Sequence, residues 1–217
     1  MNLEQARFNM VEQQIRPWEV LDQDVLDLLY VVHREEFVPP EFRALAFSDI
    51  EIPLGDGERM WAPKIEARVL QALGARKSES ALEVGTGSGY FSGLLAHCVH
   101  QVTSVEINPR LKAVSEQNLK RQGIGNVAVE LGDAAQGWKP HAPYDIIVVT
   151  GSMPILPQQF LDQLRPEGRL FAIVGDAPVM EARLITCTGR GSHRSVNLFE
   201  TSFAPLRNAL QPKRFSF

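Results

Sequence analysis

Three glycines alternate with small polar residues at Gly85, Gly87 and Gly89, directly after the mostly apolar run Ser80–Val84. A residue without a Cβ lets the backbone turn sharply and lets a ligand approach its N–H groups. A helix that begins at such a turn also directs the positive end of its dipole toward the ligand. The segment therefore predicts a site for a small polar or charged cofactor at the end of a buried strand.

The spacing of these glycines narrows the class of cofactor. The dinucleotide fingerprint is G-x-G-x-x-G, and its last glycine would fall where this chain has Tyr90. The observed G-x-G-x-G argues against NAD or FAD, whose pyrophosphate needs that glycine. It resembles motif I of the S-adenosylmethionine (SAM) dependent methyltransferases, whose cofactor carries no phosphate.

Two carboxylates are placed where they can hold other parts of the same cofactor. Glu106 lies near the end of a predicted strand at 101–107, where an acid can accept from both ribose hydroxyls. Asp133 follows a predicted strand at 127–131 and can accept from an adenine amino group. Taken singly, Glu106 also fits a solvated strand end and Asp133 a turn that bonds its own backbone. Both acids and the glycine turn fall on one edge of the predicted sheet, which favours a SAM site.

The elements that must position these residues alternate between strand and helix. We predict strands at 80–84, 101–107, 127–131 and 144–150, with a helix at 91–97, which indicates βαβ units and a parallel sheet buried on both faces. Two further strands, at 182–188 and 196–203, are expected to finish the sheet as an antiparallel hairpin. The expected fold is α/β, a doubly wound, mostly parallel seven-stranded sheet of the Rossmann-like SAM methyltransferase type.

A helical covering layer over residues 1–76 is expected to precede the sheet core of residues 77–217. Helices are predicted at 3–16, 22–33 and 63–73, the second capped by Asp22. Several prolines lie within residues 37–63. Because proline interrupts helices and strands, we predict a largely irregular segment there. The 217 residues, 44% of them hydrophobic, suit one domain.

Charge and cysteine content limit the partners and the compartment. A net charge of −4 gives no general attraction to nucleic acid, and the late basic cluster Arg190, His193 and Arg194 is interpreted as a solvated loop. Cys98, in a predicted helix, and Cys187, in a predicted strand, do not indicate a disulfide framework. The N-terminus lacks the pattern of a signal peptide, and no apolar run is long enough for a bilayer. We expect a cytoplasmic protein without nucleic acid, membrane or metal partners.

Segments beyond the glycine motif resemble protein-L-isoaspartate O-methyltransferases. In the first part of the chain they are Val11–Ile15, Val32–Pro39, Ile52–Gly57 and Glu83–Tyr90. Later ones, in the same order as in the family, include Gly132-Asp133, Tyr144-Asp145, Gly168–Leu170 and Phe203–Leu206. The resemblance covers nearly the whole chain, and its N-terminal Phe-Val-Pro and Pro-Leu-Gly elements are the most particular to this family.

This resemblance implies an enzyme that transfers a methyl group from SAM to the α-carboxylate of L-isoaspartyl residues in damaged proteins. Isoaspartyl proteins or peptides are then the partners, and a monomer is expected. Glu106 would hold the ribose, Asp133 would lie near the adenine, and Glu83 would contact the methionine ammonium through water. The other cofactor residues that we expect are Gly85, Thr86, Gly87, Ser88, Gly89, Ile107, Ala134 and Thr150.

One segment departs from the family at the reaction centre. Where the family reads Gly-Gln-Thr-Ile-Ser-x-Pro, this chain reads Gly57-Glu58-Arg59-Met60-Trp61-Ala62-Pro63. Trp61 replaces the active-site serine with an indole, which has a donor but no acceptor. Arg59 is a candidate to grip a carboxylate with a charge-assisted fork, and we predict Arg59 and Trp61 as the catalytic residues. Lys64 is interpreted as a solvated surface residue.

Trp61 leaves three functions open. It either packs the covering layer and closes the old substrate site, or it forms an aromatic wall for a different substrate. The chain is accordingly an isoaspartyl repair enzyme with a modified carboxylate grip, a methyltransferase of another carboxylate or small molecule, or a SAM-binding protein without transferase activity. A NAD-dependent dehydrogenase is disfavoured by the glycine spacing.

Overall fold

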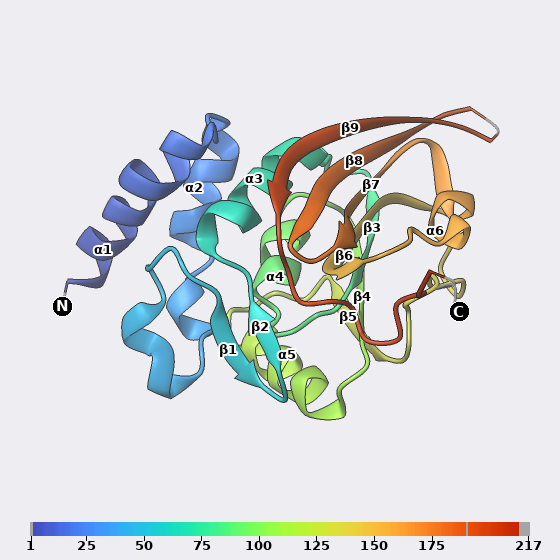
Figure 1. Ribbon diagram of the computed structural model, residues 1–217. Coiled ribbons are helices and arrows are strands. Elements are labelled where there is room, and N and C mark those ends of the chain that lie inside the picture. Colours follow the sequence, from blue (N-terminus) through green and yellow to red (C-terminus); the bar gives the residue numbers. More distant parts are fainter. Residues whose placement is uncertain (1, 190, 213–217) are drawn as a thin grey trace.

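The centre of the structure is a seven-stranded sheet with strand order β5-β4-β3-β6-β7-β8-β9 (Figure 1). The computed structural model describes residues 2–189 and 191–212. Strands β3 to β7 run parallel, whereas β8 and β9 form an antiparallel hairpin at one edge. The predicted fold class and the closing hairpin are confirmed. The strands are β3 (Ser80–Val84), β4 (Gln101–Glu106), β5 (Val127–Leu131), β6 (Tyr144–Met153), β7 (Leu164–Asp176), β8 (Val179–Gly189) and β9 (Ser192–Thr201).

Both faces of the central strands are buried under other elements. The sheet helices are α3 (Pro63–Leu73), α4 (Tyr90–Ala96), α5 (Pro109–Arg121) and α6 (Gln158–Asp162). On β6, Ile146 and Val148 belong to one buried cluster, which contains residues of α3 and α4. Ile147 and Val149 point to the other face, into a cluster with Phe160 of α6. Burial on both sides explains why the central strands are almost continuously apolar.

The covering layer lies before the sheet in the chain and beside it in space (Figure 1). Its elements are α1 (Leu3–Met10), the π-helix η1 (Val11–Ile15), the 3-10 helix η2 (Arg16–Trp18), α2 (Gln23–Val31), the 3-10 helices η3 (Arg34–Glu36) and η4 (Pro40–Leu45), β1 (Ile52–Gly55) and β2 (Glu58–Met60). The predicted helices are present. Asp22 caps α2 by accepting from the backbone N–H groups of Asp24 and Val25.

The prediction that residues 37–63 are largely irregular was wrong for their second half. β1 and β2 pair as an antiparallel hairpin, with Ile52 opposite Met60. Three consecutive residues with positive φ, from Gly55 to Gly57, make the tight turn. The Asp56-Gly57 pair is a known hairpin signal, which the density of prolines obscured in the sequence.

Two smaller expectations also need correction. Because α4 ends at Ala96, Cys98 lies after the helix, while Cys187 lies in β8, and both are free. Because β9 begins at Ser192, His193 and Arg194 lie in a strand and not in a loop; Arg190 is outside the described residues. Within residues 2–189 and 191–212, no helix has the length and apolar character needed to cross a membrane.

Candidate cofactor and substrate site

The glycine turn after β3 requires glycine at its positions. Gly85 and Gly87 have φ of 93° and 56°, a region that side chains disfavour. A Cβ on Gly85 would lie 2.3 Å from Oγ1 of Thr150, and one on Gly87 would lie 3.2 Å from Cδ1 of Leu54. Thr150 itself donates to the carbonyl oxygen of Gly85 at 2.8 Å. The turn therefore keeps its backbone open to a ligand.

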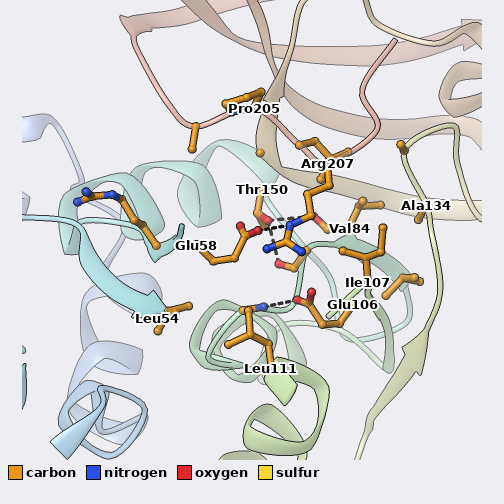
Figure 2. A pocket seen from close by; sticks show the side chains of 18 of the residues that line it. Leu54, Glu58, Val84, Glu106, Ile107, Leu111, Ala134, Thr150, Pro205 and Arg207 are labelled. Carbon is orange, nitrogen blue, oxygen red and sulfur yellow. Dashed lines mark hydrogen bonds and ion pairs between the residues drawn. The ribbon is translucent and has the colours of Figure 1, made fainter. Parts of the chain in front are cut away.

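Backbone donors beside the same turn hold Glu106. The N–H of Gly87 donates to Oε2 and the N–H of Asn108 donates to Oε1, both at 2.9 Å. The side chain is buried but lines the cavity (Figure 2). Each carboxylate oxygen has a further lone pair. Glu106 can thus accept from two neighbouring hydroxyls while its orientation stays fixed.

Asp133, in the turn after β5, has two donors of its own. The N–H of Ala135 donates to Oδ1 at 3.0 Å, and Nδ2 of Asn208 donates to Oδ2 at 2.8 Å. The first contact is the local turn bond that the sequence analysis gave as the alternative role of Asp133. Asp133 nevertheless lines the cavity, beside its neighbour Ala134, which Figure 2 shows. The turn bond and a ligand contact are therefore compatible.

One cavity at the carboxyl ends of the parallel strands brings most of the predicted site together. The predicted residues that line it are Arg59, Trp61, Gly85, Gly87, Glu106, Ile107, Asp133, Ala134 and Thr150. A smaller adjoining cavity shares several of these and adds Glu83, Thr86 and Ser88. Gly89 lines neither cavity and instead forms the N-cap of α4 with φ of 84°. Among the described residues, no group of three or more His, Cys, Asp or Glu side chains is suited to a metal ion.

Glu83, at the base of the smaller cavity, is fully buried. The hydroxyls of Ser92 and Ser104 donate to its Oε2, the latter at 2.6 Å, whereas Oε1 has no partner within the described part of the chain. Burial raises the pKa of Glu83 to about 7, the hydroxyl bonds oppose this rise, and the charge of Glu106 adds to it. A buried oxygen without a donor fits a ligand that brings one, such as the ammonium of an amino-acid moiety.

Trp61 packs in an aromatic cluster between the covering layer and the sheet. Its ring centroid lies 5.5 Å from that of Phe91, 5.9 Å from Phe171 and 6.0 Å from Phe203. Nη2 of Arg34 donates to the Trp61 carbonyl oxygen at 2.5 Å. The side chain is only 6% exposed, and it lines both cavities. Trp61 therefore satisfies both interpretations, because it packs the layer and walls the site.

Within residues 2–189 and 191–212, the Arg59 side chain makes no hydrogen bond and has only a loose ion-pair contact. Its Nε lies 4.0 Å from Oε2 of Glu51, and its side chain is 53% exposed. Lys64, by contrast, pairs with Asp49 at 2.7 Å and lies over the ring of Trp18, outside both cavities. Arg59 is therefore positioned to meet a ligand, and Lys64 is not.

The C-terminal strap, residues 203–207, forms one wall of the cavity. The sequence analysis did not predict this wall. The N–H of Ser152 donates to the carbonyl of Ala204, and the N–H of Leu206 donates back to the carbonyl of Ser152. These bonds lay the strap against the end of β6. Gly151 makes room for it, because a Cβ there would lie 2.8 Å from the Leu206 backbone. The family-like segment Phe203–Leu206 is visible in the sequence, but its crossing of the site is not.

Three charged residues that line the cavity were also missed. Nε of Arg207 donates to Oε1 of Glu58 at 2.6 Å, and its Nη2 donates to the carbonyl of Asp56 at 3.0 Å. Figure 2 shows Arg207 and Glu58 meeting within the cavity from opposite walls. Glu51 lines the cavity as well, beside Arg59. No motif marks any of the three residues, because they come together only through the hairpin and the strap.

Comparison with known proteins gives a consistent result. The chain matches the family described as protein-L-isoaspartate(D-aspartate) O-methyltransferase over residues 5–211. It is 38% identical to a protein-L-isoaspartate O-methyltransferase of Methanoculleus marisnigri, covering 92% of this chain and 90% of that one. It is 37% identical to protein-L-isoaspartate O-methyltransferase 1 of Syntrophobacter fumaroxidans, covering 95% of this chain and 96% of that one.

A solved structure shares the fold over almost the whole chain. It is a Plasmodium falciparum protein, described as a beta-aspartate methyltransferase in complex with S-adenosyl-L-homocysteine, with a TM-score of 0.78 and 21% identity. The match covers 95% of this chain and 99% of the other. Three observations point to the same family. They are the seven-stranded fold, the matched range of the family model and the identity to the relatives. The chain belongs to the protein-L-isoaspartate(D-aspartate) O-methyltransferase family.

Proposed function

We propose that this protein transfers a methyl group from SAM to the α-carboxylate of isoaspartyl residues in damaged proteins and peptides. Membership of the family supports the reaction class. The observation that carries the proposal is the cavity itself, where the glycine turn and the carboxylates of Glu106 and Asp133 line one space. That arrangement fits a cofactor with a ribose, an adenine and an amino-acid moiety.

The residues present fit SAM along its length. Glu106 would accept from the ribose hydroxyls and Asp133 from the adenine amino group, while Gly85 and Gly87 leave room for the methionine portion. The unpartnered Oε1 of Glu83 suits the methionine ammonium, directly or through water. When bound, the cofactor supplies an electrophilic methyl group on a sulfonium. Thr150 would help to hold the glycine turn in place for the cofactor, through its bonds to the Val84 and Gly85 carbonyls.

The reaction requires little acid–base catalysis from the protein. A substrate carboxylate is already ionised at neutral pH, so the protein must hold a weak oxygen nucleophile in line with the methyl group and exclude water. We assign the carboxylate grip to Arg59, whose planar fork suits a carboxylate. The aromatic cluster around Trp61 excludes water from the same end of the cavity.

The wider expectations are part of the same proposal. We expect a monomer in the cytoplasm, with isoaspartyl proteins or peptides as partners and no nucleic acid. The net charge of −4 supports the absence of a nucleic-acid partner. Gel filtration coupled to light scattering tests the oligomeric state directly.

One observation favours a second candidate function, methylation of another carboxylate or small molecule. Trp61 fills the position of the family serine and lines the cavity, so the substrate end has a different shape and lacks that hydroxyl. A SAM-binding protein without transferase activity is the further alternative. All three functions use the same cofactor residues. They differ in the role that they give to Arg59 and Trp61.

Transfer of a labelled methyl group from SAM to an isoaspartyl peptide tests the proposal. The same peptide with normal aspartate is the control, and the labelled product must release methanol at alkaline pH as a methyl ester does. Selective transfer to the isoaspartyl peptide is expected. Binding of SAM without any transfer would overturn the repair function and leave the other two candidates.

A further inference from the structure

Six charged side chains line the cavity at the carboxyl ends of the strands, and two of them differ from the others. The six are Glu51, Glu58, Arg59, Glu106, Asp133 and Arg207. Glu106 and Asp133 accept from backbone or amide donors, and Glu58 pairs with Arg207 at 2.6 Å. Glu51 and Arg59 face each other at 4.0 Å, with no side-chain hydrogen bond for either in the described part of the chain. Within the described residues, their side chains are therefore not committed to other protein groups.

The β1–β2 hairpin holds this pair at the substrate end of the cavity. Glu51 directly precedes β1, and Arg59 lies in β2 opposite Pro53. Arg59 also lines the smaller cavity with Glu83, which we assign to the methionine portion. The opposite end, at Asp133, is assigned to the adenine. The pair thus stands near the place where the methyl group is transferred.

A substrate that covers this pair must satisfy both charges. Glu51 is already partly withdrawn from water, with its side chain 30% exposed, and burial raises its pKa while Arg59 opposes the rise. A substrate with only a carboxylate would satisfy Arg59 but would bring a like charge against Glu51, which costs affinity. A substrate with a cationic N–H donor beside the carboxylate would satisfy both.

We infer that Glu51 is a specificity-determining residue, which with Arg59 selects isoaspartyl substrates that carry a cationic nitrogen next to the methyl-accepting carboxylate. Arg59 takes the carboxylate and Glu51 takes the cation. Two sources present this chemistry, the free α-ammonium of an N-terminal isoaspartyl residue and the side chain of an adjacent lysine. The inference rests on the proposed function and adds the substrate class to it.

Two pairs of isoaspartyl peptides distinguish these sources. In the first pair, an N-terminal isoaspartyl residue has a free or an acetylated amine, assayed at pH 7, where an α-amino group with a pKa of about 7.7–8.0 is mostly protonated. In the second pair, an acetylated peptide has lysine or norleucine before an internal isoaspartyl residue. For at least one pair, the wild-type protein should favour the cationic member by about tenfold in kcat/KM, the size of one charge-assisted hydrogen bond.

The variant Glu51→Gln should abolish that preference, because the amide keeps the shape and an acceptor but loses the charge. Glu116→Gln, which removes an exposed carboxylate that pairs with Lys112 on α5, is the matched control and should keep it. Thermal unfolding of both variants checks that they are folded. Equal transfer to the members of both pairs, or a preference that survives Glu51→Gln, would overturn the inference and leave the repair function standing. Failure of every peptide to accept a methyl group, with SAM bound, would overturn both.

Discussion

Glu58 and Arg207 form an ion pair that joins the β1–β2 hairpin to the C-terminal strap within the cavity. Oε1 of Glu58 lies 2.6 Å from Nε of Arg207, and the two residues are 149 positions apart in the chain (Figure 2). Both side chains are about one-third or more exposed, at 32% and 42%. Such a pair contributes little to global stability. Because the pair joins two walls of the cavity, we expect it to affect ligand entry and release more than it affects stability.

We predict that Arg207→Ala changes the lifetime of the bound cofactor more than it changes stability. The free energy of unfolding should fall by less than about 1 kcal/mol, as for other exposed ion pairs. The dissociation rate of S-adenosylhomocysteine should rise by about three- to tenfold, because the strap loses its side-chain anchor to the β1–β2 hairpin. Stopped-flow displacement measures this rate, and urea unfolding measures the stability.

Arg183→Ala is the matched control for that variant. Arg183 pairs with Glu181 at 2.6 Å with similar exposure, but on β8 and outside both cavities. It should change stability by the same small amount and leave the dissociation rate as in the wild type. Equal rates for Arg207→Ala and the wild type would show that the ion pair does not restrain the ligand.

Gly87→Ala should weaken SAM binding by at least about tenfold, equivalent to about 1.4 kcal/mol. The added Cβ would lie in the cavity wall, 3.2 Å from Leu54, at a φ of 56° that side chains disfavour. The N–H of Gly87 also orients Glu106, so a shift of the turn disturbs the assigned ribose contact. Isothermal titration calorimetry measures the change in affinity.

Gly123→Ala separates backbone strain from cavity filling. Gly123 also has a positive φ, 69°, but a Cβ there meets nothing within 4 Å, and the residue lies outside both cavities. Both variants should lose about 1–2 kcal/mol of stability, while only Gly87→Ala should lose affinity. Wild-type affinity in Gly87→Ala would remove the glycine turn from the cofactor site.

Trp61→Ser should destabilise the protein by about 3–5 kcal/mol, the range for truncating a large buried aromatic. The indole contacts three phenylalanines, and a hydroxymethyl group would leave a void among Phe91, Phe171 and Phe203. Because the void follows from lost bulk, Trp61→Phe should cost only about 1–2 kcal/mol. Urea unfolding of both variants measures the costs, and similar values would mean that the ring does not support the fold.

The sequence was sufficient for most of the fold because its signals are local. The limits of β3, β5 and α3 follow from apolar runs and from Pro63 and Gly74 at the two ends of a helix. The edge hairpin also followed from local alternation and a glycine-rich turn. The β1–β2 hairpin did not, because its prolines suggested irregular chain while its short strands gave too little alternation to oppose them.

The site was predictable only where its residues belong to a strand end. Glu106 ends β4 and Asp133 follows β5, so the rule that parallel strand ends meet at one edge brought them together. Arg207 and Glu51 come from segments without that constraint, and tertiary packing alone places them in the cavity. Trp61 was visible as a substitution, but its packing against Phe171 and Phe203 needed the folded sheet.

Glu83 gives the protein a pH dependence of stability opposite to that of a carboxylate in an ion pair. Its pKa is about 7 in the folded protein and 4.5 as an ordinary carboxyl, because burial disfavours the charge. Between these values the unfolded chain releases a proton that the folded protein keeps. The stability contribution is therefore fully present below about pH 4.5 and is lost as pH rises through about 7.

Glu83→Gln should remove this pH dependence, since the amide does not titrate and can still accept from Ser92 and Ser104. The free energy of unfolding of the variant, relative to the wild type, should rise by about 2.5 kcal/mol between pH 5 and pH 8, since one pKa unit corresponds to about 1.4 kcal/mol. Urea unfolding of both proteins across that range measures the difference. Glu116→Gln removes an exposed carboxyl that pairs only at the surface. Its free energy of unfolding should therefore change with pH in the same way as that of the wild type. A Glu83→Gln profile that also runs parallel to the wild type would mean that the buried carboxyl keeps its ordinary pKa in the folded protein.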